Sequence, residues 1–181
     1  EIILTTSTSN ISSQNFGIEQ TPQTAIHLQP ASGNPGGFNT INIPASSFLN
    51  SNVGSNPNTE DYNGGFVTSI RIPTFPTGVN SITINNVIYT NGGACPPAST
   101  CIGWPSGGVT IPAPHGIISQ TVFVDPSDGN ASVIIPIVAI DNAGLEDPTP
   151  GNITIPFQTI AVSGTVWNDR NGNITKEVSE A

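Results

Sequence analysis

Positive charge is scarce in this chain. Of its 181 residues only three are Lys or Arg, against twelve Asp or Glu, and the formal net charge is -9. A protein that binds nucleic acid needs a basic face to neutralise phosphates, and three cations cannot form one. We therefore expect no nucleic-acid partner.

Long hydrophobic runs are also missing. The longest nearly unbroken apolar run, Val133 to Ile140, spans eight residues. A helix that crosses a bilayer needs about 20 such residues. We therefore expect no membrane insertion.

Charged residues of both signs are also few, with only 8% Asp, Glu, Lys and Arg. Disordered proteins are usually rich in charge, so this composition argues against a disordered chain.

Helical patterns are absent, whereas strand patterns recur. The 19 Gly and 17 Pro interrupt nearly every segment, and the stretches between them are rich in Thr, Ser, Ile and Val. Alternation predicts that one face of 66–72 carries Phe66, Thr68, Ile70 and Ile72, and the other Val67, Ser69 and Arg71. It also groups Ile153, Ile155 and Phe157, and separately Ile160, Val162 and Val166.

The pattern predicts an all-β fold, an immunoglobulin-like β-sandwich. The expected strands are 2–6, 15–18, 24–29, 38–43, 66–72, 80–84, 86–90, 108–111, 117–124, 131–140, 152–157 and 159–167. Residues 19–157 have the length of a complete sandwich. Residues 1–18 are similar to the last strand of a preceding module, and 158–181 to the opening of the next one.

Cysteine occurs twice, as Cys95 and Cys101 in GGACPPASTCIGWP. Pro96 and Pro97 force a turn between them. A zinc site needs two further ligands, and the histidines are distant in sequence. The spacing therefore favours a small disulfide-closed loop, with two free thiols as the alternative. A disulfide would imply an oxidising, extracytoplasmic compartment.

Several segments resemble bacterial surface proteins. GTVWNDRNGN (164–173) resembles the opening strand and acidic loop of serine-aspartate-repeat B-type domains, and NFGIEQ (15–20) resembles their closing strand. Residues 69–90 and 120–157 resemble repeats of giant cell-surface adhesins of gliding Bacteroidetes. The resemblance implies type IX secretion, an extracellular location on the bacterial cell surface, and neighbouring copies or repeats of the chain as partners.

Two acidic segments are candidate calcium sites. Asp169, Asn171, Asn173 and Glu177 place oxygen atoms at intervals that suit a loop wrapped around the ion. Ile174 replaces the glycine of an EF-hand loop, so a β-domain loop is the calcium-binding candidate, and a self-bonded Asx turn is the alternative.

The second segment is IDNAGLEDPTP, which carries Asp141, Asn142, Glu146 and Asp147. Its three carboxylates repel one another unless they are solvated or metal-bound. Calcium here would stiffen a junction between modules, whereas a solvated acidic loop is the alternative. Asp125 and Asp128 are expected to form a turn.

Catalytic signatures are lacking, since neither a G-x-S-x-G elbow nor an H-E-x-x-H motif occurs. We expect no enzyme. The resemblance implies a structural extracellular repeat or filament subunit that coheres by β-edge pairing and module packing, and the acidic loops predict that calcium stiffens it. The alternative is a carbohydrate-binding adhesin domain in which Trp104 stacks on sugar, although burial in a core would also explain Trp104 and Trp167.

Overall fold

The structure is a computed structural model that describes residues 21–22, 24, 27–48 and 66–160. Its strands are β1 (His27–Leu28), β2 (Ser32–Asn34), β3 (Ile41–Ile43), β4 (Val67–Ile72), β5 (Val79–Ile84), β6 (Val87–Thr90), β7 (Cys101–Gly103), β8 (Val109–Pro112), β9 (Val122–Pro126), β10 (Ala131–Asp141) and β11 (Gly151–Thr159). Two short 3-10 helices, η1 (Ala45–Phe48) and η2 (Pro114–Gly116), complete the described elements. Neither they nor any other described helix is long and apolar enough to cross a membrane.

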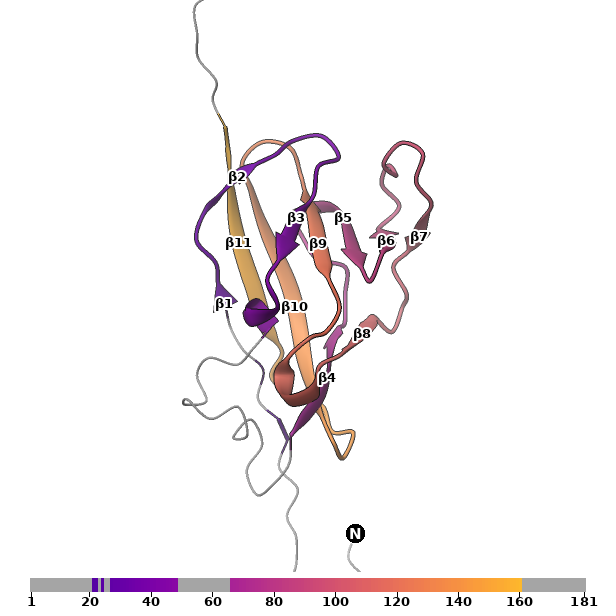
Figure 1. The fold of residues 1–181 in the computed structure, drawn as a ribbon, viewed down its shortest axis with the longest axis vertical. Helices are drawn as coiled ribbons and strands as arrows, with labels where there is room; N and C mark the ends of the chain where they lie inside the picture. Colours follow the sequence, from indigo (N-terminus) through magenta and orange to yellow (C-terminus); the bar gives the residue numbers. More distant parts are fainter. Residues whose placement is uncertain (1–20, 23, 25–26, 49–65, 161–181) are drawn as a thin grey trace, which may run out of the picture.

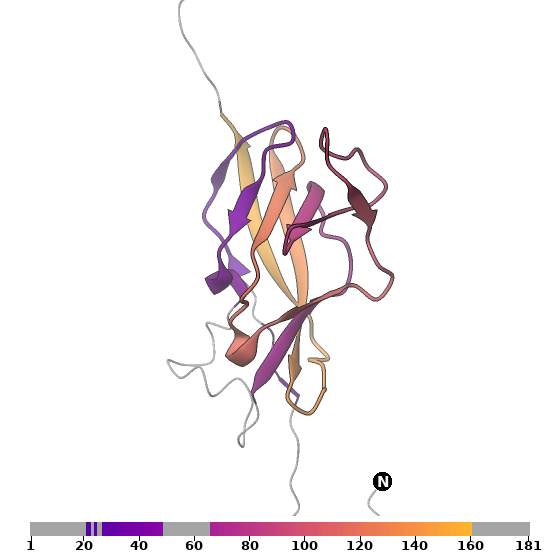
Figure 2. The same ribbon diagram turned by 45° about the vertical axis from the view of Figure 1, so that its right-hand side comes forward.

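The strands form two mixed sheets packed together in a sandwich-like arrangement (Figures 1 and 2). The first has the order β1-β11-β10-β4-β8, with β2 also pairing with β11, and the second has the order β3-β9-β5-β6-β7. β1 and β2 run parallel to β11, and β7 runs parallel to β6, while the other pairs are antiparallel. The all-β prediction is confirmed. The expected strands 2–6 and 15–18, and 159–167 beyond Ile160, lie outside the described residues.

The core lies between the sheets and consists mainly of β-branched side chains. On β11, Ile153, Ile155 and Phe157 are all buried, as their alternation predicts. They pair across β10 with Ile135, Val133 and Ala131, respectively. From the opposite sheet, buried isoleucine and valine side chains of β5 and β9 join the same cluster. Alternating inward positions on both sheets thus supply one continuous apolar layer.

A β-bulge overturns one predicted face. Ser69 pairs with Ile140 and Val67 pairs with Asp141, so Thr68 has no position opposite it. Its Oγ1 instead donates to the carbonyls of Ile140 (3.3 Å) and Asp141 (2.9 Å). The extra residue reverses the alternation, and Val67, expected on the outer face, is buried at 2% exposure.

Two prolines inside long strands lie where the pairing with one neighbouring strand is interrupted. β1 pairs with Ile153 and Thr154, β2 pairs from Phe157 onward, and Pro156 falls between the two pairings. Pro136 similarly lies between the bridge from Ile134 to Thr77 and the start of β4 pairing at Val138. Because proline has no N–H to donate, these gaps are where it is tolerated within a sheet.

Candidate ligand-binding cleft

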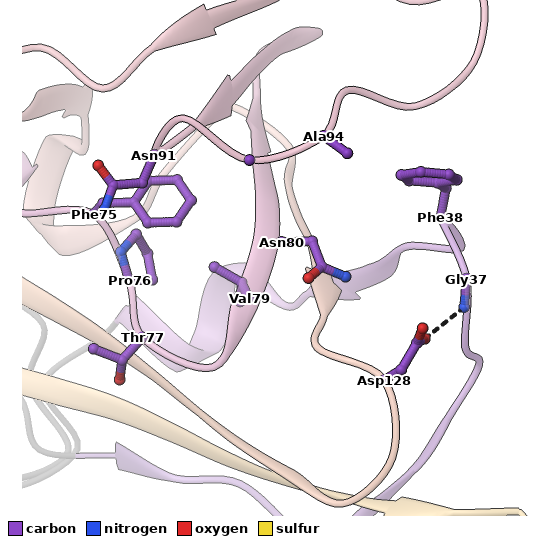
Figure 3. Close-up of a pocket in the computed structure, with 11 residues that line it drawn as sticks. Gly37, Phe38, Phe75, Pro76, Thr77, Val79, Asn80, Asn91, Ala94 and Asp128 are labelled. Atoms are coloured by element: carbon purple, nitrogen blue, oxygen red, sulfur yellow. Dashed lines mark hydrogen bonds between the residues drawn. The ribbon is translucent and has the colours of Figure 1, made fainter.

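An open cleft of about 600 Å³ lies at the end of the sandwich where β5 begins (Figure 3). Segments far apart in the sequence meet here: the β2–β3 loop, the β4–β5 turn, the start of β5, the segment after β6 and the β9–β10 turn. The aromatic rings of Phe38 and Phe75 stand on opposite sides, with Val79 and Asn80 between them. Its volume falls within the range typical of small-ligand sites.

The wall that carries Phe38 is fixed by hydrogen bonds to the β9–β10 turn. Asp128 Oδ1 accepts the backbone N–H of Gly37 at 2.7 Å. Asn34 Nδ2 donates to the carbonyls of Ser127 (2.8 Å) and Gly129 (2.7 Å). The loop is therefore tied to the β9–β10 turn at two points before Phe38, whose ring remains 44% exposed.

The opposite wall is an aromatic stack. The Phe75 ring meets Trp104 edge-on at 5.6 Å between centroids, and Trp104 meets Tyr89 in the same way at 5.3 Å. All three pack against the core. Trp104 Nε1 is buried and has no hydrogen-bond partner among the described residues. Trp104 thus contacts both Phe75 and Tyr89 while it packs against the core, and it is not one of the residues that line the cleft.

The floor joins Asn80 to a buried carboxyl group. Asn80 Nδ2 donates to the carbonyl of Pro126 at 3.3 Å and approaches Asp125 Oδ1 at 3.5 Å. Asp125 is 1% exposed, and within the described part of the chain its Oδ2 has no partner. Burial raises the pKa of Asp125, the Asn80 hydrogen bond lowers it, and nearby Asp128 raises it, so the pKa lies above its ordinary value.

The cysteines are disulfide-bonded, as the sequence favours, with 6.0 Å between the Cα atoms of Cys95 and Cys101. The bond closes the loop 95–101, which directly follows the cleft-lining residues Asn91, Gly93 and Ala94. It also indicates an oxidising, non-cytoplasmic compartment. The disulfide therefore constrains the loop that begins directly after the rim residue Ala94.

The acidic β10–β11 hairpin uses each predicted metal ligand for a different contact. Asp141 Oδ1 accepts the N–H groups of Ala143 and Leu145, both at 2.8 Å, and shapes the turn. Glu146 forms an ion pair with the guanidinium of Arg71 on β4. Asn142 Oδ1 accepts the N–H of Phe66 at 3.1 Å.

Asp147 ties the first described residues to the hairpin. Its Oδ2 accepts the N–H of Thr24 at 2.5 Å, and its Oδ1 accepts both the N–H and the hydroxyl of Thr149 at 2.7 Å. Burial raises the pKa of Asp147, but these hydrogen bonds outweigh burial and hold the pKa below its ordinary value.

The described ranges bring no three His, Cys, Asp or Glu residues together in a group that could hold a metal. Asp141, Glu146 and Asp147 are close in sequence but directed at separate partners. The other calcium candidates, Asp169, Asn171, Asn173 and Glu177, lie outside the described residues, as does Trp167. Calcium binding therefore stays a prediction from the sequence.

Sequence reasoning missed Phe38, Phe75, Asn80 and Asn91 as site residues. They come from four separate segments, and only the sheet topology places them around one cleft. One local signal was available in NPGGF (34–38). A Gly-Gly turn, in which Gly36 and Gly37 both have positive φ, presents an aromatic residue to solvent.

No protein-family model, curated protein or solved structure matches this chain. The fold and the cleft define its class as a disulfide-bonded domain of two packed β-sheets, with an open cleft at one end.

Proposed function

We propose that this chain is a structural module of an extracellular bacterial surface protein, an adhesin or filament. Modules of this kind extend a stalk by joining end to end, and they cohere by β-edge pairing and module packing. The observation that carries the proposal is the path of the chain, which enters at one end of the sandwich and leaves at the other.

Hydrogen bonds mark the two ends. Thr24 is tied to the β10–β11 hairpin, since its N–H donates to Asp147 and its Oγ1 accepts the N–H of Ala139 at 3.0 Å. Thr159 lies at the opposite end of the same strand pair, where its N–H donates to Asn130 Oδ1 at 2.9 Å. β11 runs the length of the sandwich between them (Figure 1). Copies linked in series through these ends would form an extended rod.

The proposal includes an immunoglobulin-like class for the sandwich. Its support is the parallel pairing of β1 and β2 with β11, which are the first and last strands of the described part of the chain. After β4 the chain crosses to the second sheet, where it forms β5, β6 and β7, and it then crosses back so that β8 pairs with β4. This order departs from a simple sandwich of this type. Among the described strands, β8 is an edge of the first sheet opposite β1 and β2, and β3 and β7 are the edges of the second; such edges offer backbone groups for pairing with another module.

Calcium stiffening belongs to the proposal on the strength of the sequence at 169–177. Binding to the native state alone would raise the melting temperature. A full-length chain whose melting is unchanged between millimolar calcium and a chelator would remove calcium from the proposal. An Asp169→Ala variant provides the matched control, because it should lose any calcium effect.

The experiment for the structural function is electron microscopy of the protein isolated from its native cell envelope. We expect fibres or strings with an axial repeat of one module length. Compact, isolated particles that remain dispersed with and without calcium would contradict a structural role. Surface labelling of intact cells with an antibody to this domain tests the proposed location in parallel.

A further inference from the structure

We propose that the cleft between Phe38 and Phe75 binds a neutral sugar, with a pyranose ring stacked on one or both aromatic rings. This binding function is separate from the structural role and does not depend on it. It also relocates sugar recognition from Trp104 to residues that line the cleft, with Trp104 in contact with Phe75.

The aromatic surfaces are held ready before any ligand arrives. Phe38 is 44% exposed, yet its loop is fixed by the hydrogen bond from Gly37 to Asp128. Phe75 is held against Trp104. A pyranose has one face of C–H groups, and a fixed aromatic ring offers that face a contact with little loss of conformational freedom. Figure 3 shows the two rings across the cleft from each other.

The polar groups that line the cleft suit hydroxyls. Asn80 and Asn91 both line the cleft. Asn80 donates its Nδ2 to Pro126 and Asp125 and offers its side-chain oxygen as an acceptor, while the Asn91 amide has both a donor and an acceptor. Asp128 uses Oδ1 to hold Gly37, and a carboxylate can accept further hydrogen bonds through its second oxygen. A ring of neighbouring hydroxyls needs both donors and acceptors at short intervals, as this arrangement provides.

Charge argues against an anionic ligand. Among the described residues Arg71 is the only Lys or Arg, and it is paired with Glu146 away from the cleft lining. Phosphates, nucleotides and acidic sugars carry negative charge, and in this cleft they would meet the Asp128 carboxyl group with no Lys or Arg among the lining residues. A sugar without charge avoids this repulsion.

Pairing within the sheet argues against an extended peptide. A peptide strand binds by adding to an open sheet edge, where backbone groups supply its affinity. β5 contributes Val79 and Asn80 to the floor, and it pairs with β9 from Val79 onward and with β6 from Ile82 onward. The stretch of β5 that lines the cleft without a β6 partner is too short for a peptide strand to add to, so recognition in this cleft rests on rings and side chains.

The test is a titration of the ¹⁵N-labelled full chain with uncharged methyl pyranosides, followed by NMR. The probes are the glucoside, the mannoside, the galactoside and the N-acetylglucosaminide, which vary the substituents at C2 and C4. They are added up to roughly 100 mM, because single sugar rings bind weakly. We expect at least one probe to shift the amides of Gly37, Gly93 and Ala94 and the side-chain amides of Asn80 and Asn91.

Variants decide whether the rings carry the binding. Phe38→Ala should weaken the affinity for the shifting sugar at least about fivefold, whereas Phe38→Tyr should keep it, because the ring remains. Ile117→Ala removes a similarly exposed apolar side chain outside the cleft and should leave the affinity unchanged. Since Phe38 and Ile117 are both well exposed, neither substitution should prevent folding.

Failure of this inference is distinct from failure of the structural role, which concerns assembly seen by microscopy. If no probe shifts the cleft amides, the cleft does not bind neutral sugars. If shifts occur but persist in Phe38→Ala, or map to residues outside the cleft, this site is wrong. Either outcome leaves the axial repeat of a fibre unaffected.

Discussion

At the scale of single residues, two buried carboxyl groups affect stability in opposite directions. Asp125 has a raised pKa, so above that pKa the folded state holds a charge that burial disfavours. Asp147 has a lowered pKa, because hydrogen bonds from Thr149 and Thr24 outweigh burial. The Asp147 contribution is present above its unfolded pKa of about 4 and is lost as pH falls through the lower folded value.

We therefore predict that Asp125→Asn stabilises the protein at pH 7 by about 1 kcal/mol. Asparagine keeps an oxygen that can accept from Asn80 and removes the buried charge. The gain should shrink as pH falls through the raised pKa of Asp125, because the wild-type carboxyl group then takes up a proton and becomes neutral. Urea unfolding of both proteins between pH 7 and pH 4 measures this change.

Asp147→Asn is the matched control for that experiment. It should destabilise the protein at pH 7 by about 1 to 2 kcal/mol, since charged acceptors make the stronger hydrogen bonds. Its deficit should diminish only at pH values below about 4. If both variants changed stability equally and without dependence on pH, the assigned pKa directions would be wrong.

The turn after β10 supports a second prediction at this scale. Asp141→Ala removes the acceptor for two backbone N–H groups, those of Ala143 and Leu145, and should cost about 2 to 3 kcal/mol. Asp141→Asn retains one acceptor oxygen at the same position and should cost less. Denaturant midpoints compare the two variants. A negligible loss in Asp141→Ala would mean that the turn does not depend on these bonds.

At the scale of elements, alternation identified the strands that are long and half-buried. Residues 131–140 and 152–157 were expected as strands, and β10 and β11 cover them with extensions of one or two residues. These strands carry enough inward-facing isoleucine and valine for the period of two to be visible. The all-β class follows from such segments together with the frequent turn residues.

Short strands left no comparable signal. β2 (Ser32–Asn34) and β7 (Cys101–Gly103) were not expected, because both are very short and β2 also pairs with a strand far away in sequence. The bulge at Thr68 is invisible in the sequence for a related reason: it depends on the register of β10. The cleft was missed because its two rings are brought together only by the packing of loops from different strands.

Gly78 lies where the β4–β5 turn closely approaches β10. It has a positive φ of 73°, and an added Cβ would lie 2.2 Å from the carbonyl oxygen of Ser132 on β10. We predict that Gly78→Ala destabilises the protein by about 3 kcal/mol or more, since both the backbone conformation and the space require glycine. Thermal unfolding compares it with Gly93→Ala, where the added methyl group meets nothing within 4 Å.

Gly93→Ala should change stability by less than about 0.5 kcal/mol. Because Gly93 lines the cleft, the same variant also reports whether added bulk at the rim matters for ligands. If Gly78→Ala were as mild as Gly93→Ala, the β4–β5 turn would not lie against β10 as described.

At the scale of the whole molecule, the geometry of the ends determines how the domain bears tension. β1 and β2 run parallel to β11, and the chain enters and leaves at opposite ends. A force along the chain therefore slides the terminal strands past each other and loads their hydrogen bonds together. A force applied at one end only would open the same bonds one after another.

This difference gives a prediction for single-molecule pulling. In a Thr21→Cys, Ile160→Cys variant, handles attached to the new thiols apply force through both ends, and we expect a high rupture force. In a Thr21→Cys, Ala143→Cys variant, both handles lie at the hairpin end, and we expect a severalfold lower force because β1 is peeled away. All three positions are exposed, and the native cysteines remain in their disulfide.

Forced unfolding depends on the barrier along the pulling direction, so the two variants can differ in rupture force even with the same equilibrium stability. Chemical denaturation of both variants provides that control. Equal rupture forces would show that the parallel terminal pairing does not bear the load, and the argument from chain path to a stalk would then lose its mechanical basis. A module that works under tension in a stalk needs a high rupture force along the chain axis, and it does not need one in other directions.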